Sequence, residues 1–237
     1  MNQTKKCQIC PRLAEKLIIS HNFLLPLCLE HEKRLESKFG EIELTTKNST
    51  IYTPQEVSQF INELLKDKIE ERGIILDPCC GQGSLLKPWE DNYRLFSYDT
   101  YGVNIDEKGS ESNLIADFFT LTKEGFELNY FSELEVKKPI LILCNPPFNG
   151  YPGKLACEVW LDKIIELFGK EVPIVLFVPM GFRLNRTKFN SNHYPPISSI
   201  ISLPRDIFPQ VEFHTEILIF NIKGLQPHYF FKPYEQH

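Results

Sequence analysis

The sequence predicts an α/β protein with a doubly wound sheet of seven strands, mostly parallel, with an antiparallel last strand. Short apolar runs alternate with helical patterns along the chain. Runs such as residues 140–143 lack polar alternation, as expected of parallel strands that are covered on both faces. With 237 residues and 42% apolar content, the chain is long enough to bury one sizeable core and a small additional module.

The order of elements supports this fold class. The expected strands cover residues 73–76, 94–98, 113–116, 140–144, 173–178, 198–202 and 215–221. The expected helices cover residues 54–70, 84–89 and 155–168. Only a short segment with Pro204 and Pro209 separates the last two strands, which leaves no room for a crossover helix. We therefore expect these two strands to form an antiparallel hairpin at the end of the sheet.

Charge and hydropathy exclude several classes of protein. A formal net charge of -5 argues against a protein that coats nucleic acid non-specifically, although a basic face would still suit a nucleic-acid enzyme. No apolar run approaches the ~18 residues of a membrane span, and the N-terminus has no apolar segment behind its charges. Seven cysteines, an odd number, do not suggest a secreted disulfide framework. We expect a cytoplasmic protein without a membrane partner.

The charge is unevenly distributed between two expected domains. Residues 1–40 contain seven Lys/Arg and four Asp/Glu, a charge of +3, which leaves -8 for the remainder when +3 is subtracted from the total of -5. A polar connector follows. The sequence therefore predicts a small module over residues 1–40 and a main domain over residues 51–237.

The small module carries a candidate zinc site. Cys7 and Cys10 form one close pair, and Cys28 and His31 form a second. Three thiolates and one imidazole make a tetrahedral ligand set for structural zinc, and so short a segment would hardly fold without it. Four unrelated residues are the alternative interpretation. We expect one Zn²⁺ ion in this module.

A glycine-containing turn follows the first expected strand. It has the sequence Asp-Pro-Cys-Cys-Gly-Gln-Gly from Asp77 to Gly83. Ligands of doubly wound sheets bind outside the carboxyl ends of the strands, and Gly81 and Gly83 allow the backbone to approach a ligand closely. Asp99, expected to end the second strand, lies where an acidic residue commonly binds ribose hydroxyls. Leu86 replaces the third glycine of a dinucleotide motif, so a nicotinamide cofactor is disfavoured.

A second motif follows the apolar run of residues 139–144. It consists of Asn145, Pro146, Pro147 and Phe148. An exocyclic amine is a poor nucleophile until acceptors hold its hydrogens, and the Asn145 side-chain oxygen and the Pro146 carbonyl would supply them. The two prolines restrict the backbone, and Phe148 would stack on the nucleic-acid base that carries the amine. A core aromatic is the alternative for Phe148. The motif predicts S-adenosylmethionine-dependent methylation of an exocyclic or amide nitrogen.

Together these motifs resemble the amino-group DNA methyltransferases, in particular the N6-adenine group whose cofactor motifs precede the catalytic one. The resemblance covers residues 51–223 and implies a Rossmann-like fold, S-adenosylmethionine as cofactor, and methyl transfer to the N6 amino group of adenine in DNA. It implies catalytic roles for Asn145, Pro146, Pro147 and Phe148. It implies cofactor-binding roles for Tyr52, Thr53, Pro54, Asp77, Pro78, Cys80, Gly81, Gly83, Asp99, Asp117, Phe118 and Asn145.

Three other functions stay open at this point. A protein-glutamine N-methyltransferase also holds a planar amide with Asn-Pro-Pro and an aromatic residue. The second alternative is an RNA adenine methyltransferase. The third is a non-catalytic subunit that binds DNA or a partner. Residues 224–237 are too few for the target-recognition region that such enzymes usually carry. Target recognition is therefore expected from the zinc module, the loop of residues 182–196, or a partner protein.

Overall fold

The chain divides into two compact units, residues 1–50 with 147–156 and residues 51–146 with 157–237. The computed structural model describes residues 16–20, 23–27, 51–69, 73–89, 98–104, 114–115, 118–123, 139–147, 154–208 and 214–232. In the smaller unit, β1 (Lys16–Ser20) and β2 (Phe23–Leu27) form an antiparallel pair. The predicted zinc ligands of this unit lie outside the described residues.

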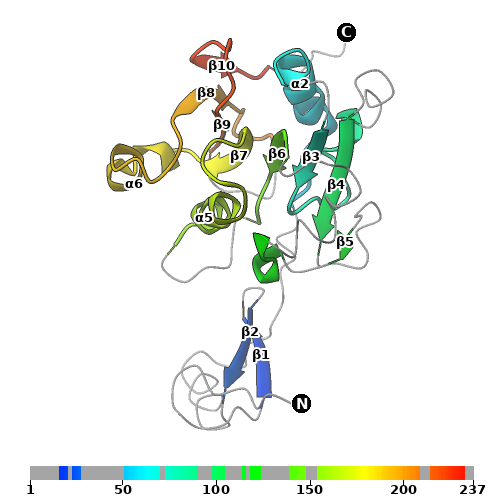
Figure 1. Cartoon of the computed structure of the whole chain (residues 1–237), viewed down its shortest axis with the longest axis vertical. Helices are drawn as coiled ribbons and strands as arrows, with labels where there is room; N and C mark the ends of the chain where they lie inside the picture. Colours follow the sequence, from blue (N-terminus) through cyan, green and yellow to red (C-terminus); the bar gives the residue numbers. More distant parts are fainter. Residues whose placement is uncertain are drawn as a thin grey trace. The chain divides into compact units, whose positions relative to one another are not determined.

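The larger unit is built around an eight-stranded sheet (Figure 1). In spatial order its strands are β10 (His228–Phe230), β8 (Ile197–Ser202), β9 (Thr215–Phe220), β7 (Ile174–Pro179), β6 (Leu141–Cys144), β3 (Gly73–Asp77), β4 (Tyr98–Asn104) and β5 (Leu114–Ile115). Among these described strands only β9 runs antiparallel to its neighbours, β7 and β8. The prediction of an α/β fold with a mostly parallel sheet is confirmed.

The carboxyl-terminal part of the sheet differs from the prediction in two ways. The described residues include an eighth strand, β10, which pairs parallel with β8, whereas seven strands were predicted. The predicted antiparallel pairing of β8 and β9 is confirmed, but β9 lies inside the sheet rather than at its end. All six residues of β9 are buried, whereas β8 alternates between buried and half-buried residues. The last four residues of β9, Ile217 to Phe220, are apolar, and such a run is favoured in the interior because both its faces are covered.

The position of β4 also differs from the prediction. It begins at Tyr98, so that Tyr98 pairs with Gly73 and Gly102 pairs with Asp77. Asp99 pairs with Ile74, three residues before Asp77 on the neighbouring strand. With a rise of about 3.3 Å per residue, Asp99 lies about 10 Å along the strand from the carboxyl end of β3. The expectation that Asp99 ends this strand is therefore wrong.

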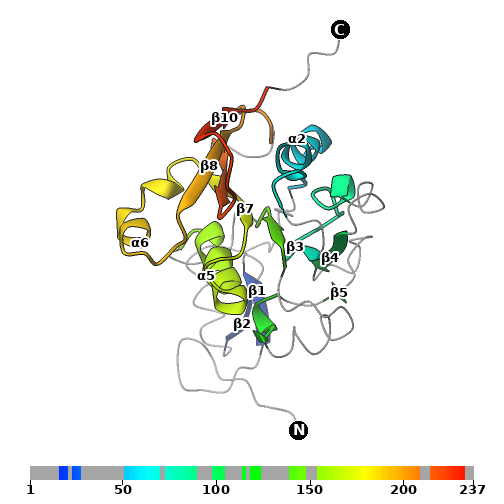
Figure 2. The same ribbon diagram turned by 45° about the horizontal axis from the view of Figure 1, so that its top comes forward.

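The helices of the larger unit are amphipathic. The longer ones are α2 (Gln55–Leu65) and α5 (Ala156–Phe168), and the shorter ones are α6 (Arg186–Asn190), η1 (Phe118–Thr120) and η3 (Phe182–Leu184). In α2, Val57, Ile61 and Leu65 recur every four residues and are fully buried. This helix ends five residues before the predicted end at residue 70. Of the predicted helix at 84–89, only residues 87–89 are helical. Figures 1 and 2 both place α6 on the β7–β8 side, away from β4 and β5.

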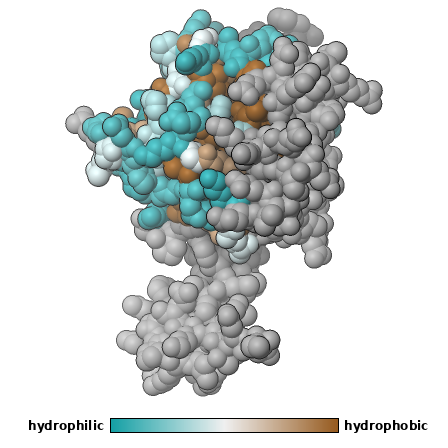
Figure 3. Space-filling view, in the orientation of Figure 1, coloured by the Kyte–Doolittle hydropathy of each residue, from teal (hydrophilic) through white to brown (hydrophobic). Residues whose placement is uncertain are grey.

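The core lies around the central strands. Every residue of β6 is buried, as are residues 74–77 of β3 and 174–178 of β7. Each fully buried Leu, Ile or Val side chain contributes about 1.5–3 kcal/mol relative to its exposed state. Hydrophilic residues cover the surface over α5 and α6 (Figure 3). Within the described part of the chain, no helix is long and apolar enough to cross a membrane.

Candidate active site

The sheet reverses its strand order between β3 and β6. From β3 the chain proceeds to β4 and β5 on one side, and it then returns to β6 and β7 on the other. The two strands are parallel neighbours, with Ile75 opposite Leu141. Asp77 ends β3 and Asn145 follows β6, so both residues lie at the carboxyl edge of this switch point. This is where doubly wound sheets bind their ligands.

The turn after β3 requires two glycines. Gly81 has φ +55° and Gly83 has φ +77°, a region that residues with a Cβ rarely adopt. The Gly83 amide donates to the Cys80 carbonyl at 2.8 Å, and the Leu86 amide donates to the Gly83 carbonyl at 3.0 Å. A Cβ atom at Gly81 would lie 3.0 Å from Cε1 of Tyr52. A side chain at either position would strain the turn, and at Gly81 it would also crowd the Tyr52 ring; the approach of a ligand to this backbone stays a prediction.

Asp77 is buried at the start of this turn. Its side chain is 2% exposed, and its Oδ1 accepts a hydrogen bond from the Cys79 amide at 3.0 Å. Burial raises the pKa of Asp77 to about 7, and the hydrogen bond from Cys79 opposes this shift only in part. A cationic ligand group next to Asp77 would favour the ionised form. Asp77 can thus gain or lose a proton near neutral pH.

Two thiols lie close together at the carboxyl ends of β3 and β6. The sulfur atoms of Cys79 and Cys144 are 3.8 Å apart, and no disulfide is found among the described cysteines. Burial raises the pKa of both thiols and raises that of Cys157 to about 12. Since the thiolate is the reactive form, these side chains are not nucleophiles at neutral pH. The prediction that Cys144 and Cys157 are core residues is confirmed.

The Asn145 side chain is held by the segment before α2. Its Nδ2 donates to the Ile51 carbonyl at 3.3 Å and to Oγ1 of Thr53 at 3.0 Å. A backbone carbonyl can only accept a hydrogen bond, so the amide nitrogen must point toward Ile51. Oδ1 of Asn145 is buried and has no hydrogen-bond partner among the described residues. An unpaired buried acceptor costs stability, which makes it a candidate for binding a donor on a ligand.

The structure brings together a core group of the predicted site residues. Tyr52 lies against Gly81, and Thr53 contacts Asn145, which follows the strand next to Asp77. Pro78 and Pro146 are buried at the ends of the same two strands, and Cys80 is buried within the glycine turn. Sequence reasoning missed the Ile51 carbonyl, because a backbone group leaves no signal in the residue type.

Other predicted residues lie apart from this group or cannot be placed. The Pro54 carbonyl accepts hydrogen bonds from the first amides of α2. Phe118 is buried and stacks on Trp160, with ring centroids 5.4 Å apart. Phe148 and Asp117 lie outside the described residues. The cofactor role of Phe118 and the roles of Asp99, Asp117 and Phe148 stay predictions.

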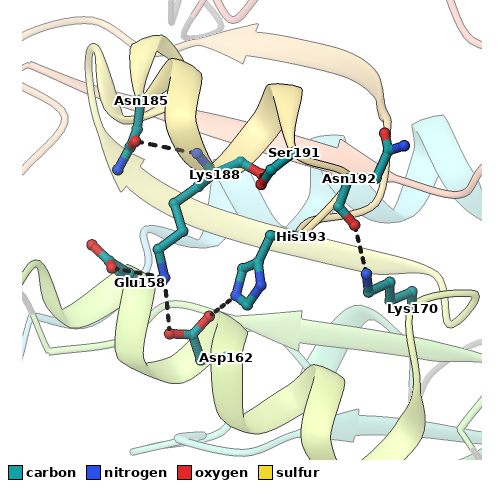
Figure 4. Close-up of polar contacts among 8 residues, drawn as sticks. All are labelled: Glu158, Asp162, Lys170, Asn185, Lys188, Ser191, Asn192 and His193. Carbon is teal, nitrogen blue, oxygen red and sulfur yellow. Dashed lines mark hydrogen bonds and ion pairs between the residues drawn. The ribbon is translucent and has the colours of Figure 1, made fainter.

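The loop of residues 182–196 was one candidate for contacting DNA through its cations. In Figure 4, Lys188 bridges two acidic residues of α5, with Nζ at 3.3 Å from Glu158 and 3.6 Å from Asp162. His193 contacts Asp162 at 3.0 Å. The guanidinium of Arg183 lies 3.2 Å from the buried carboxylate of Glu216. These side chains neutralise charges within the fold, which favours an anchoring role over phosphate contact.

Metal ligands are not clustered in the part of the chain that the structure describes. No group of three or more His, Cys, Asp or Glu side chains there could hold a metal ion. Cys7, Cys10, Cys28 and His31 lie outside that part.

The sheet and its switch point define a methyltransferase-like α/β fold. A solved structure described as a class I S-adenosylmethionine-dependent methyltransferase from Listeria monocytogenes superposes with a TM-score of 0.54 at 17% identity, covering 85% of this chain and 70% of that one. A structure described as a modification subunit of a type I restriction enzyme from Vibrio vulnificus gives a TM-score of 0.51 at 14% identity, covering 88% and 51%.

Sequence comparison adds a more specific similarity. Residues 37–152 match the family described as N-6 DNA Methylase. The methylase subunit of the type I restriction enzyme MjaVII from Methanocaldococcus jannaschii is 27% identical in an alignment of length 219. The aligned part covers 74% of this chain. The match covers 37% of the length of that relative, so this chain corresponds to about a third of it.

Proposed function

We propose that this chain transfers a methyl group from S-adenosylmethionine to the N6 amino group of adenine in DNA. The observation that carries the proposal is the Asn145 amide, whose nitrogen is held by Ile51 and Thr53 while its buried oxygen has no partner in the part of the chain that the structure describes. The similarity of residues 37–152 to N-6 DNA methylases supports the same reaction.

The arrangement of protein groups suits an amine substrate. Oδ1 of Asn145 would accept a hydrogen from the amino group, and the carbonyl of Pro146 would accept the second. Acceptance of both hydrogens draws the nitrogen lone pair out of the ring and makes it nucleophilic. An acceptor that is already oriented needs little reorganisation during the reaction. Asn145 thus acts in the transition state more than in binding.

The glycine turn suits the cofactor. Gly81 and Gly83 have left-handed backbone conformations that shape the turn, and Asp77 offers a carboxyl group at the same edge. S-adenosylmethionine, when bound, supplies an electrophilic methyl group. Tyr52, Pro78, Cys80, Asp99, Asp117 and Phe118 complete the proposed cofactor-binding set. Because both this cofactor and DNA are intracellular, the proposal places the chain in the cytoplasm.

The reaction can be tested by identifying the product. The purified chain is incubated with isotopically labelled S-adenosylmethionine and, separately, with duplex DNA, RNA and protein acceptors. Digestion and mass spectrometry should find labelled N6-methyladenine in DNA. Label confined to cytosine, RNA or protein glutamine would contradict the proposal, and the Asn145→Ala variant provides the background.

We also propose a partner that contributes target recognition. The relative from Methanocaldococcus jannaschii is named as a subunit and is much longer than this chain. In addition, Arg183, Lys188 and His193 of the loop at 182–196 contact acidic side chains within the fold. If the isolated chain methylates no acceptor, the same product assay is repeated on protein purified with its bound partners.

The zinc site of the smaller unit is a further part of the proposal. Cys7, Cys10, Cys28 and His31 provide three sulfur ligands and one nitrogen ligand, a set suited to Zn²⁺. Elemental analysis of the purified chain should find about one zinc per chain under this four-ligand interpretation. A variant with Cys7→Ser and Cys10→Ser should lose the metal, and fluorescence of Trp89 and Trp160 should show the larger unit still folded. Equal zinc in the variant and the wild type would contradict the site.

A further inference from the structure

We infer that Thr53 is a positioning residue that orients the catalytic amide, rather than a direct contact of the cofactor. This inference rests on the proposed function, in which Oδ1 of Asn145 accepts a hydrogen of the target amine. Thr53 is 6% exposed, and its Oγ1 is 3.0 Å from Nδ2 of Asn145. Its hydroxyl thus faces the catalytic side chain from within the fold.

The hydrogen-bond roles are determined by the partners. Nδ2 of Asn145 has two hydrogens, and the Ile51 carbonyl takes one of them at 3.3 Å. The other points to Oγ1 of Thr53, which therefore acts as the acceptor. With both hydrogens engaged, a rotation that exchanged the nitrogen and the oxygen of the amide would place Oδ1 against the Ile51 carbonyl, two acceptors facing each other. Oδ1 is left as the group presented to a substrate.

The same segment contacts the glycine turn. Between Ile51 and Thr53, the ring of Tyr52 lies so close to Gly81 that a Cβ there would be 3.0 Å from Cε1 and 3.3 Å from Cδ1. Pro54 is the N-cap residue of α2, whose buried face anchors the segment to the core. Three consecutive residues thus join the proposed cofactor turn to the proposed catalytic amide. Residue 53 contributes the only side-chain hydrogen bond to Asn145 that is found among the described residues.

The test compares Thr53→Val, which removes the hydroxyl at nearly constant shape, with Thr53→Ser, which keeps it. Thr53→Val should lower kcat for DNA methylation about tenfold, and Thr53→Ser should restore most of it. KM for DNA and the calorimetric Kd for S-adenosylmethionine should change less than about twofold, since the lost contact acts in the transition state. Ser58→Ala is the matched control, because Ser58 is buried in α2 and bonds locally to the Gln55 carbonyl.

A spectroscopic measurement separates this inference from the proposed function. In protein labelled with ¹⁵N-asparagine, the side-chain amide signal of Asn145 is assigned by its loss in Asn145→Ala. Thr53→Val should shift this signal and speed its hydrogen exchange, whereas Thr53→Ser and Ser58→Ala should leave it unchanged. An unchanged signal with at least tenfold weaker cofactor binding would overturn the inference and make Thr53 a cofactor contact. If the wild type methylates no DNA either alone or purified with its bound partners, the proposed function fails while the amide signal still decides the role of Thr53.

Discussion

Asn145→Ala is expected to reduce methyl transfer by about 100- to 1000-fold, the effect of removing one preorganised polar group from a transition state. The oxygen of this amide has no partner among the residues that the structure describes, so its loss removes an interaction that the proposed substrate makes. Cofactor affinity should stay within about threefold of the wild type, because the glycine turn is unchanged. Single-turnover kinetics and calorimetry measure the two quantities separately.

Two further variants define the role of the amide. Asn145→Asp keeps an acceptor but places a carboxylate oxygen against the Ile51 carbonyl, so it should retain only part of the activity. Asn190→Ala, at an exposed position that ends α6, should behave as wild type. Full activity of Asn145→Ala would show that the chemistry lies elsewhere, and equal loss of cofactor binding would show that Asn145 acts in binding.

Asp77→Asn is expected to raise the free energy of unfolding by several kcal/mol above pH 7 and to leave it nearly unchanged near pH 4. In the folded chain the pKa of Asp77 is about 7, raised from 3.8 by burial. Between these two values the folded state binds a proton that the unfolded state has released. The contribution of Asp77 to stability is therefore fully present below pH 3.8 and is lost as the pH rises through 7. The folded and unfolded pKa values differ by about three, which corresponds to roughly 4 kcal/mol in the free energy of unfolding.

The asparagine variant keeps an acceptor for the Cys79 amide but carries no charge. Relative to wild type, Asp77→Asn should be more stable by roughly 4 kcal/mol at pH 8 and about equally stable near pH 4. Urea unfolding of the cofactor-free protein measures this, with Trp89 and Trp160 reporting on the larger unit. Exposed Asp206→Asn is the control. Lower stability of Asp77→Asn at pH 8 would mean that a partner stabilises the ionised carboxylate.

The sequence by itself determined the fold class and the buried character of the central strands. Apolar runs such as residues 141–144 indicate buried strands wherever they occur, because burial on both faces excludes polar residues. The left-handed turn at Gly81 and Gly83 follows from residue type in the same way. These features depend on the local chain, and local patterns identify them.

Only the tertiary structure decided how the site residues are paired. The Ile51 carbonyl contacts Asn145 across 94 positions of the chain, and a backbone atom has no residue-specific signature. The register of β4 depends on pairing with β3, which is why Asp99 lies opposite Ile74 rather than at the end of the strand. Likewise, the sequence does not distinguish whether Lys188 contacts phosphate or forms an ion pair within the fold. In the structure it forms ion pairs with acidic residues of α5. Such choices are set by distant groups whose proximity exists only after the sheet has formed.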